Sequence, residues 1–192
     1  MQTTNSKHYL RKYDNIAKGM SITAPEQLWV SDITYVRSNE GWMFLSLITD
    51  AFSRKIVGYS IADNMEATTV ASALKMALAG RIDQHACPVH HSDRGIQYCS
   101  KEYTELAISH GLTLSMTQNA DPYENALAER MNRTLKEEFG LGMTLPSKKI
   151  AIPLTKEAIN LYNNRRPHLA LNMKTPNQIH TKIPAHEATG TI

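Results

Sequence analysis

Three acidic residues, Asp32, Asp93 and Glu129, stand where a carboxylate has no obvious structural purpose. Asp32 interrupts a strand-like apolar run, Asp93 directly follows another, and Glu129 lies in a helical pattern. An unpaired carboxylate taken out of water costs on the order of several kcal/mol, and carboxylates that converge also repel one another. A divalent cation removes both penalties, and an oxygen-rich site suits Mg²⁺ or Mn²⁺. The three acids therefore predict metal-dependent chemistry at one site.

The residues around the three acids make this prediction specific, because some Asp–Asp–Glu triple occurs at almost any spacing in a chain with 18 acidic residues. Thirty-five residues separate Asp93 from Glu129. The informative segments are WVSDITY (29–35), GW (41–42), DAFSRKIVG (50–58), HSDRGIQY (91–98), NALAER (125–130) and YNNRRPH (162–168). In this order they resemble the catalytic core of the DDE transposases of bacterial insertion sequences, above all the group whose core is similar to retroviral integrase. The resemblance covers roughly residues 25–180.

The order of apolar segments predicts an α/β fold. Three strands rich in Val, Ile, Leu and Tyr are separated by short turns, which favours an antiparallel meander. Alternating helices and strands follow, and this order is typical of a mixed five-stranded sheet flanked by helices. The predicted strands are 28–36, 42–49, 55–61, 87–91 and 112–116, and the predicted helices are 66–79, 100–110, one around Glu129, and a last one at 155–164 closed by Pro167. The resemblance narrows this architecture to the ribonuclease-H-like fold.

The bulk properties fit one domain with polar ends. A chain of 192 residues with 42% hydrophobic residues can bury a core, and its net charge of +3 permits nucleic-acid binding without requiring it. We predict a basic polar linker or tail at 1–24, a catalytic core at 25–180 and a tail at 181–192. The sequence has no apolar run that could span a membrane, and its two cysteines fit a reducing bacterial cytoplasm. The resemblance implies a helix-turn-helix region upstream, which this sequence lacks.

Helical periodicity explains how Glu129 can avoid the core. At about 100° per residue, one stripe of its helix is apolar and would dock against the sheet. That stripe consists of Leu127, Ala128, Met131, Leu135 and Phe139. Glu129 falls on a different stripe with Asn125, Asn132, Arg133 and Lys136. The alternative interpretation is an ordinary solvated face with a Glu–Arg pair four residues apart.

Several further residues are candidates for contact with DNA or with the acids. Arg133 and Lys136 follow Glu129 by one and two helical turns and could hold the phosphate backbone, or they could simply keep the helix soluble. Asn125 has two interpretations, as a residue that lines the site or as the first residue of the helix. Arg166 likewise would either contact DNA or close the last helix. His91 is a candidate for a residue that positions Asp93, and the alternative is a purely structural role in the fold. Residues 121–124 read as a capping box that would begin the Glu129 helix.

The resemblance implies phosphoryl transfer at DNA phosphodiesters with two Mg²⁺ ions, for which Mn²⁺ would substitute, roughly 3.5–4 Å apart. Asp32 would bridge both ions, and Asp93 and Glu129 would each complete one. The implied partners are the insertion-sequence ends and target DNA, and related recombinases lead us to expect a homo-oligomer.

Two other functions remain open from the sequence. A ribonuclease H or junction resolvase shares the carboxylates but lacks the other matching segments, and a transposase remnant would bind DNA without turnover. A zinc site is disfavoured, because the nearby candidate ligands do not have zinc-ligand spacing; they are His85, Cys87, His90, His91 and Cys99. Asp50 and Asp63 are rival acids, but each sits beside a turn, where an aspartate needs no metal.

Overall fold

The computed structural model describes residues 8–118 and 125–181. Its centre is a five-stranded sheet in the order β3-β2-β1-β4-β5. The strands are β1 (Leu28–Ser38), β2 (Gly41–Asp50), β3 (Ile56–Ala62), β4 (Val89–Ser92) and β5 (Thr113–Met116). The first three strands pair antiparallel, and β1–β4 and β4–β5 pair parallel. The predicted mixed sheet is therefore confirmed, and the strands that lead to Asp32 and Asp93 lie side by side.

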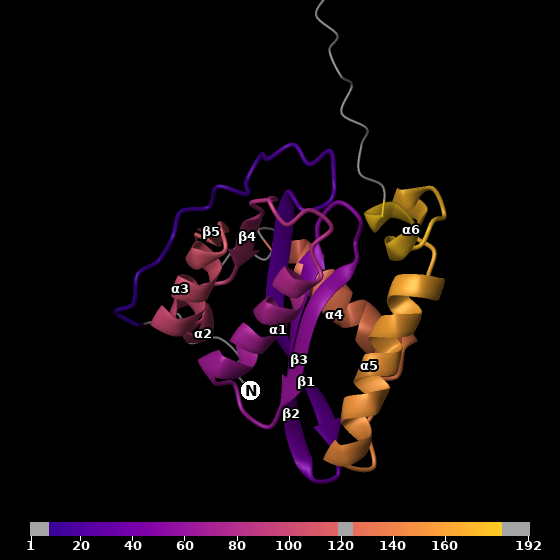
Figure 1. Ribbon diagram of the computed structural model, residues 1–192. Helices are drawn as coiled ribbons and strands as arrows, with labels where there is room; N and C mark the ends of the chain where they lie inside the picture. Colours follow the sequence, from indigo (N-terminus) through magenta and orange to yellow (C-terminus); the bar gives the residue numbers. More distant parts are fainter. Residues whose placement is uncertain (1–7, 119–124, 182–192) are drawn as a thin grey trace, which may run out of the picture.

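Helices cover both faces of this sheet (Figure 1). They are α1 (Ala67–Ala79), α2 (Ile96–Cys99), α3 (Lys101–Ser109), α4 (Ala126–Glu138), α5 (Lys148–Arg165), the 3-10 turn η2 (Leu169–Leu171) and α6 (Pro176–His180). None of the helices in the described part of the chain is both long and apolar enough to cross a membrane.

Alternation along β1 divides the core into two layers. Trp29 and Ile33 pack with the apolar residues of α1 and α3. Val36 points to the opposite face and packs with the apolar stripes of α4 and α5. Because side chains alternate along a strand, Asp32 belongs to the same face as Val36, which is the face that α4 covers. The strand pattern therefore directs Asp32 towards the helix that carries Glu129.

The C-terminal part of the chain differs from the sequence prediction. Helix α5 begins at Lys148 rather than at residue 155, because Ser147 caps it by accepting a hydrogen bond from the N–H of Ile150 at 3.3 Å. Pro153 lies inside this helix and costs it one backbone hydrogen bond, which hid its first turns from a pattern search. The predicted last helix is not the last, since α6 follows beyond Pro167.

Helix α6 is fastened to the β2–β3 turn by a buried polar network. The Ser53 hydroxyl lies 2.9 Å from His180 Nδ1 and donates to Asp50 Oδ1 at 2.7 Å. Asp50 also accepts from the backbone N–H of Glu26 at 2.7 Å. Burial raises the pKa of the Asp50 carboxyl, but hydrogen bonds involving His180, Ser53 and Glu26 outweigh it and leave that pKa lowered. Asp50 is therefore held by protein groups, as its place beside a turn predicts.

Residues 8–24, assigned to the linker from sequence, form no helix or strand but contact the sheet. The Ser115 hydroxyl on β5 accepts hydrogen bonds from the N–H groups of Ile16 and Ala17 at 3.1 and 3.2 Å. Ala17, Met20 and Ile22 then pack beside the apolar end of β1. This segment therefore closes one end of the face that carries Asp32.

His90 should make the fold sensitive to acid. Its Nε2 lies 2.8 Å from the Ser31 hydroxyl and 2.9 Å from the Tyr103 hydroxyl, and burial lowers its pKa to about 3. An unfolded histidine has a pKa of about 6.5, so this contribution is complete above that pH and is lost as pH falls towards 3. We expect a loss of about 2–3 kcal/mol in unfolding free energy between pH 7 and pH 4.5, measured by urea unfolding.

The matched comparison is His90→Asn against His110→Asn, since His110 is exposed. Only His90→Asn should flatten the dependence of unfolding free energy on pH. An unchanged slope in that variant would contradict the assignment of a neutral buried imidazole to His90.

Candidate catalytic site

Asp32 and Asp93 meet where two parallel strands part. Strands β1 and β4 pair at only three positions, the last of which joins Val30 to His91. Each acid lies two residues beyond that final pair, so the register sets Asp32 and Asp93 at matching positions. Asp93 Oδ1 accepts a hydrogen bond from the N–H of Gly95 at 2.9 Å, which orients its carboxylate at the start of the following turn.

Glu129 reaches the same region from α4. Ala128, Met131 and Leu135 are buried against the sheet, whereas Glu129 is exposed, as the predicted stripes require. A groove of about 380 Å³ is lined by residues of α4 and β1. Its lining includes Asp32, Tyr35, Glu129, Asn132, Arg133 and Lys136. The groove thus joins two of the predicted acids to both predicted cations of α4.

The electrostatics of Asp32 show that the three acids interact. Its pKa is raised to about 7, first by burial and then by the nearby negative charges of Asp93 and Glu129. Hydrogen bonds from the Ile33 backbone and the Asn132 side chain oppose this rise. A carboxyl with this pKa is held in a position where extra positive charge would stabilise its ionised form.

Asn132 is a site residue to which sequence reasoning gave no role. Its side-chain nitrogen donates to Asp32 Oδ2 at 2.7 Å, and its side chain is buried between α4 and β1. The available signal was its position on the Glu129 stripe, three residues after the acid. Asn125, a predicted DNA contact, is also buried and donates to the Ser31 carbonyl at 3.1 Å. The two amides therefore fix α4 on β1, one on each side of Glu129.

The predicted cations differ in their surroundings. Lys136 places its ammonium 5.7 Å from the centre of the Tyr35 ring, and partial burial lowers its pKa while Asp32 acts to raise it. Arg133 lines the groove and is exposed. Arg166 instead forms a two-pronged ion pair with Glu138, with Nε 2.7 Å from Oε2. Lys136 and Arg133 are therefore near the acids, whereas Arg166 ties α5 to α4.

His91 lies on β4 and is buried. Its Nδ1 is 2.8 Å from the Ser115 hydroxyl, and its side chain lines a second, larger cavity on the same face of the sheet. The capping box read at residues 121–124 lies outside the described residues; the described helix α4 begins at Ala126 with Asn125 as its N-cap.

The donor set fits a hard divalent cation. Within residues 8–118 and 125–181, no three His, Cys, Asp or Glu side chains gather closely enough to hold an ion. The three acids nonetheless offer only oxygen donors, which Mg²⁺ prefers, and the pKa of Asp32 is raised by burial and then by the charges of Asp93 and Glu129, both of which a bound cation would offset. The groove therefore suits a metal that binds together with an anionic substrate.

Comparison with known proteins agrees with the fold. The HTLV-2 integrase catalytic core domain in complex with magnesium superposes with a TM-score of 0.65 at 21% identity, over 82% of this chain and 97% of that one. This match confirms the predicted ribonuclease-H-like fold.

Sequence relatives cover most of this chain. An uncharacterised 31 kDa protein of insertion element IS600 from Shigella sonnei is 37% identical over 176 residues, which is 91% of this chain and 64% of that protein. The transposase for IS629 from Shigella sonnei is 34% identical over 86% of this chain and 55% of its own length. The chain thus spans somewhat over half of these relatives. Two family models, both described as integrase core domain, match residues 22–122 and 110–176. The chain belongs to the integrase core domain family.

Proposed function

We propose that this chain is the catalytic core of an insertion-sequence transposase, which cuts DNA strands and joins their 3′ ends to target DNA. The observation that carries the proposal is the groove between β1 and α4, where Asp32 and Glu129 lie beside Arg133 and Lys136. The similarity to the IS629 transposase supports the same reaction class. Such an enzyme would act on DNA in the bacterial cytoplasm.

Asp32, Asp93 and Glu129 would hold two Mg²⁺ ions, for which Mn²⁺ would substitute. These ions would polarise the scissile phosphate and favour deprotonation of the attacking hydroxyl. Asn132 holds one oxygen of Asp32 and so fixes the direction in which the carboxylate points. Lys136 and Arg133 supply positive charge for the DNA backbone beside the reacting phosphate. Asn125 keeps the start of α4 against β1 and thereby sets the position of Glu129.

The decisive experiment is strand transfer on a branched DNA that already joins an element end to target DNA. We expect turnover with Mg²⁺ or Mn²⁺, none with EDTA, and none in Glu129→Gln. A pre-assembled branch reduces the need for a separate end-binding region. Hydrolysis without strand transfer would favour the nuclease alternative, and metal-independent DNA binding without turnover would favour a transposase remnant.

Removing the Asn132 side chain should impair the site without disturbing DNA binding. Loss of a group that orients a metal-binding carboxylate typically costs about 10- to 100-fold in activity or metal affinity. We therefore expect Asn132→Ala to lower kcat by at least about 10-fold, to raise the Mg²⁺ requirement, and to leave KM for DNA nearly unchanged. Asn160→Ala on α5 is the control, because Asn160 is exposed and distant from the groove in sequence. Equal kcat values in the two variants would argue against this role.

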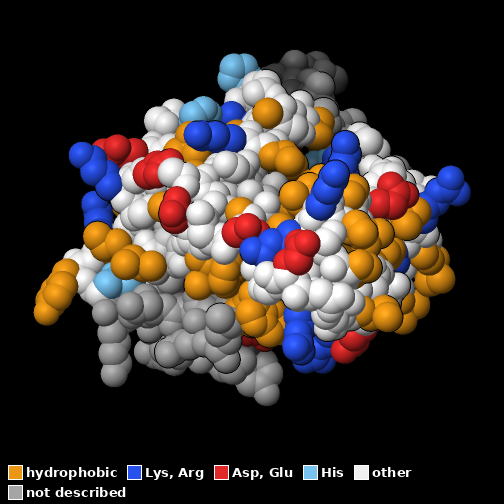
Figure 2. Space-filling view, turned by 90° about the horizontal axis from the view of Figure 1, so that it is seen from below, with side chains coloured by type: hydrophobic (Ala, Val, Ile, Leu, Met, Phe, Trp, Pro, Cys, Tyr) orange, Lys and Arg blue, Asp and Glu red, His pale blue; other side chains and the backbone are white. Residues whose placement is uncertain are grey.

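We propose further that the chain forms homo-oligomers through α5. Figure 2 shows apolar side chains gathered on the side of the molecule where α5 lies in Figure 1. Ile150, Leu154 and Leu161 are each at least 40% exposed and share one stripe of this helix. Leu154→Lys should shift sedimentation towards monomer at micromolar protein, whereas Lys156→Glu should not. Recognition of the element ends would come from an upstream helix-turn-helix region, on this chain or on a partner.

A further inference from the structure

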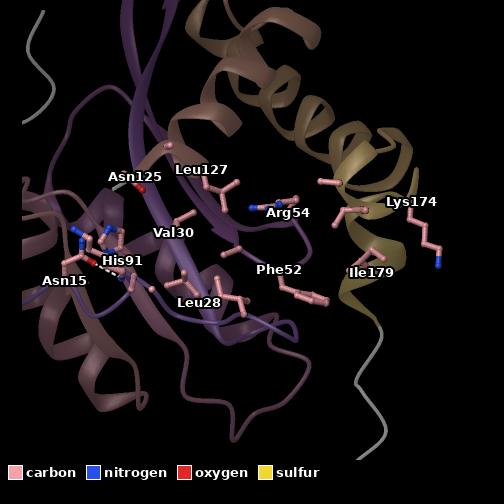
Figure 3. A pocket seen from close by; sticks show the side chains of 18 of the residues that line it. Asn15, Leu28, Val30, Phe52, Arg54, His91, Asn125, Leu127, Lys174 and Ile179 are labelled. Carbon is pink, nitrogen blue, oxygen red and sulfur yellow. Dashed lines mark hydrogen bonds between the residues drawn. The ribbon is translucent and has the colours of Figure 1, made fainter. Parts of the chain in front are cut away.

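A cavity of about 950 Å³ lies on the face of the sheet that carries Asp32. Its walls come from β1, β4, the β2–β3 turn, the start of α4, the N-terminal segment and the region from η2 to α6 (Figure 3). Much of the lining is apolar, and it includes Leu28, Val30, Phe52, Leu127 and Ile179. A cavity of this size and character is large enough for an organic group the size of a nucleotide.

The charged residues of the cavity lining are all basic. Lys18, Arg54 and Lys174 contribute to it, and none of its described lining residues is an Asp or Glu. A pocket with cationic groups and apolar walls is complementary to a molecule that carries both an anion and a flat apolar surface.

Arg54 gives the pocket its specific feature. It belongs to the β2–β3 turn, adopts a left-handed φ of 64°, and is held in place by a hydrogen bond from the Tyr162 hydroxyl to its carbonyl at 2.8 Å. Burial lowers the pKa of its guanidinium and Arg130 acts in the same direction, whereas Tyr162 and Asp50 act to raise that pKa. Within the described residues its guanidinium makes no hydrogen bond or salt bridge. In Figure 3 its side chain lies between the residues of β1 and those of the C-terminal helical segment.

A half-buried guanidinium that forms no hydrogen bond or ion pair of its own can gain from an added anion, even though the charge of Asp50 acts on it from nearby. The backbone of Arg54 adopts a conformation that few residues other than glycine adopt, and the turn holds it there. Arg54 therefore offers an anion a partner beside an apolar wall.

The position of the cavity connects it with the acids. Asn125, Ala126 and Leu127 line it from the first turn of α4, and Glu129 lies within one further turn of the same helix. Val30 lines it from β1, two residues before Asp32. The cavity therefore lies next to the acids along both β1 and α4, where DNA that flanks the scissile phosphate would pass.

We propose that the cavity receives an unpaired nucleotide of the DNA strand that flanks the scissile phosphate. Arg54 binds its phosphate, and its base lies against Phe52 and the aliphatic wall. This inference rests on the proposed function. Bases that are already unpaired require no unstacking, so the pocket should favour DNA with single-stranded nucleotides beside the cleavage site.

Binding to labelled branched DNA tests the proposal directly. Fluorescence anisotropy in Ca²⁺ would compare a fully paired branch with one that carries two unpaired nucleotides beside the scissile phosphate. We expect wild type to bind the unpaired form about 10-fold more tightly, and Arg54→Gln to lose that preference while its affinity for the paired form changes little. Arg54→Lys should restore part of it. Lys75→Gln on α1 removes one charge from an exposed position and should preserve the preference.

A second measurement locates the base. A photoreactive 5-iododeoxyuridine at the unpaired position should cross-link to Phe52 or its neighbours in β2–β3, and Phe52→Ala should abolish that product. Thermal unfolding establishes whether each variant is folded. If Phe52→Ala does not fold, the binding test with Arg54→Gln still decides the proposal.

Three outcomes would overturn the proposal. Equal weakening by Arg54→Gln and Lys75→Gln on both DNAs would show only diffuse electrostatic attraction. A cross-link outside the cavity lining would place the base elsewhere. A shift in sedimentation of the DNA-free protein in Arg54→Gln would indicate that a second copy fills the cavity. If any of these three outcomes occurs while strand transfer is intact, the proposed function still holds. If the protein binds no DNA at all, both the cavity proposal and the proposed function are overturned.

Discussion

Asp32→Asn should reduce metal-dependent strand cleavage and strand transfer by roughly 10³-fold or more. Asp32 is the acid that both Asp93 and Glu129 influence, and asparagine cannot supply the negative charge that a pair of divalent ions requires. Asp93→Asn and Glu129→Gln should have effects of the same order, since the three side chains act together. Single-turnover kinetics on the branched DNA would measure the loss without interference from product release.

The matched control is Asp63→Asn, because Asp63 is an exposed acid paired with Lys148 at 3.0 Å and lies outside the groove. Near-normal turnover in any of the three acid variants, with Asp63→Asn also active, would remove that acid from the catalytic set. The comparison requires each variant to be folded, and Asp32→Asn offers an internal check of this.

The stability of metal-free Asp32→Asn should rise rather than fall at pH 8. The pKa of Asp32 is about 7 in the folded protein, above the ordinary value of 3.8. The protonated Asp32 carboxyl therefore contributes to the unfolding free energy fully below about pH 4, and this contribution is lost as pH rises through 7. Asparagine cannot ionise, so the variant avoids this decrease in unfolding free energy, which has an upper bound of roughly 4 kcal/mol. If Asp32→Asn is inactive yet at least as stable as wild type at pH 8, its inactivity comes from the missing carboxylate and not from unfolding.

Gly58→Ala should be among the most destabilising single-methyl substitutions in the chain. Gly58 lies in β3 where α1 crosses, and an added Cβ would stand 2.2 Å from the Ala73 carbonyl oxygen and 2.9 Å from the Ala77 Cβ. The first contact is with helix backbone, which cannot yield as a side chain can. We expect a loss of about 3 kcal/mol or more in unfolding free energy, measured in urea.

Gly80→Ala is the control for this effect. Gly80 ends α1, and an added Cβ there would meet its nearest neighbour at 3.5 Å, an ordinary contact. Its substitution should change stability by less than about 1 kcal/mol. Similar losses in the two variants would show that α1 and β3 can separate at little cost.

Local sequence patterns were sufficient for the sheet and for the direction of Glu129. The three antiparallel strands follow from apolar runs joined by short turns, and the stripe of α4 follows from helical periodicity. The three acids could be proposed as catalytic because the segments around them resemble a known family in order and type. These features depend on residues close together in the chain, where the spacing of apolar residues follows the period of the strand or helix that they form.

Other features depend on partners far away in the sequence and left no local signal. The amide of Asn125 reaches a carbonyl 94 residues earlier, and His180 meets a hydroxyl 127 residues earlier. Pro153 disguised the start of α5, because a proline inside a helix usually marks its boundary. The large cavity arises from six separate segments, so its charge and its unpaired guanidinium became visible only once those segments were assembled.

The short pairing of β1 with β4 gives the two aspartates unequal backbone support. Ladder bonds between these strands end at Val30 and His91, and β4 itself ends at Ser92, whereas Asp32 is still paired with Leu47 of β2. Glu129 lies on a helix that two amides hold to β1, and one of these amides binds Asp32 itself. Asp32 and Glu129 therefore belong to one connected unit, and Asp93 lies just past the end of a neighbouring strand. In the proposed enzyme, a change in the spacing of the three acids during the reaction would come from Asp93.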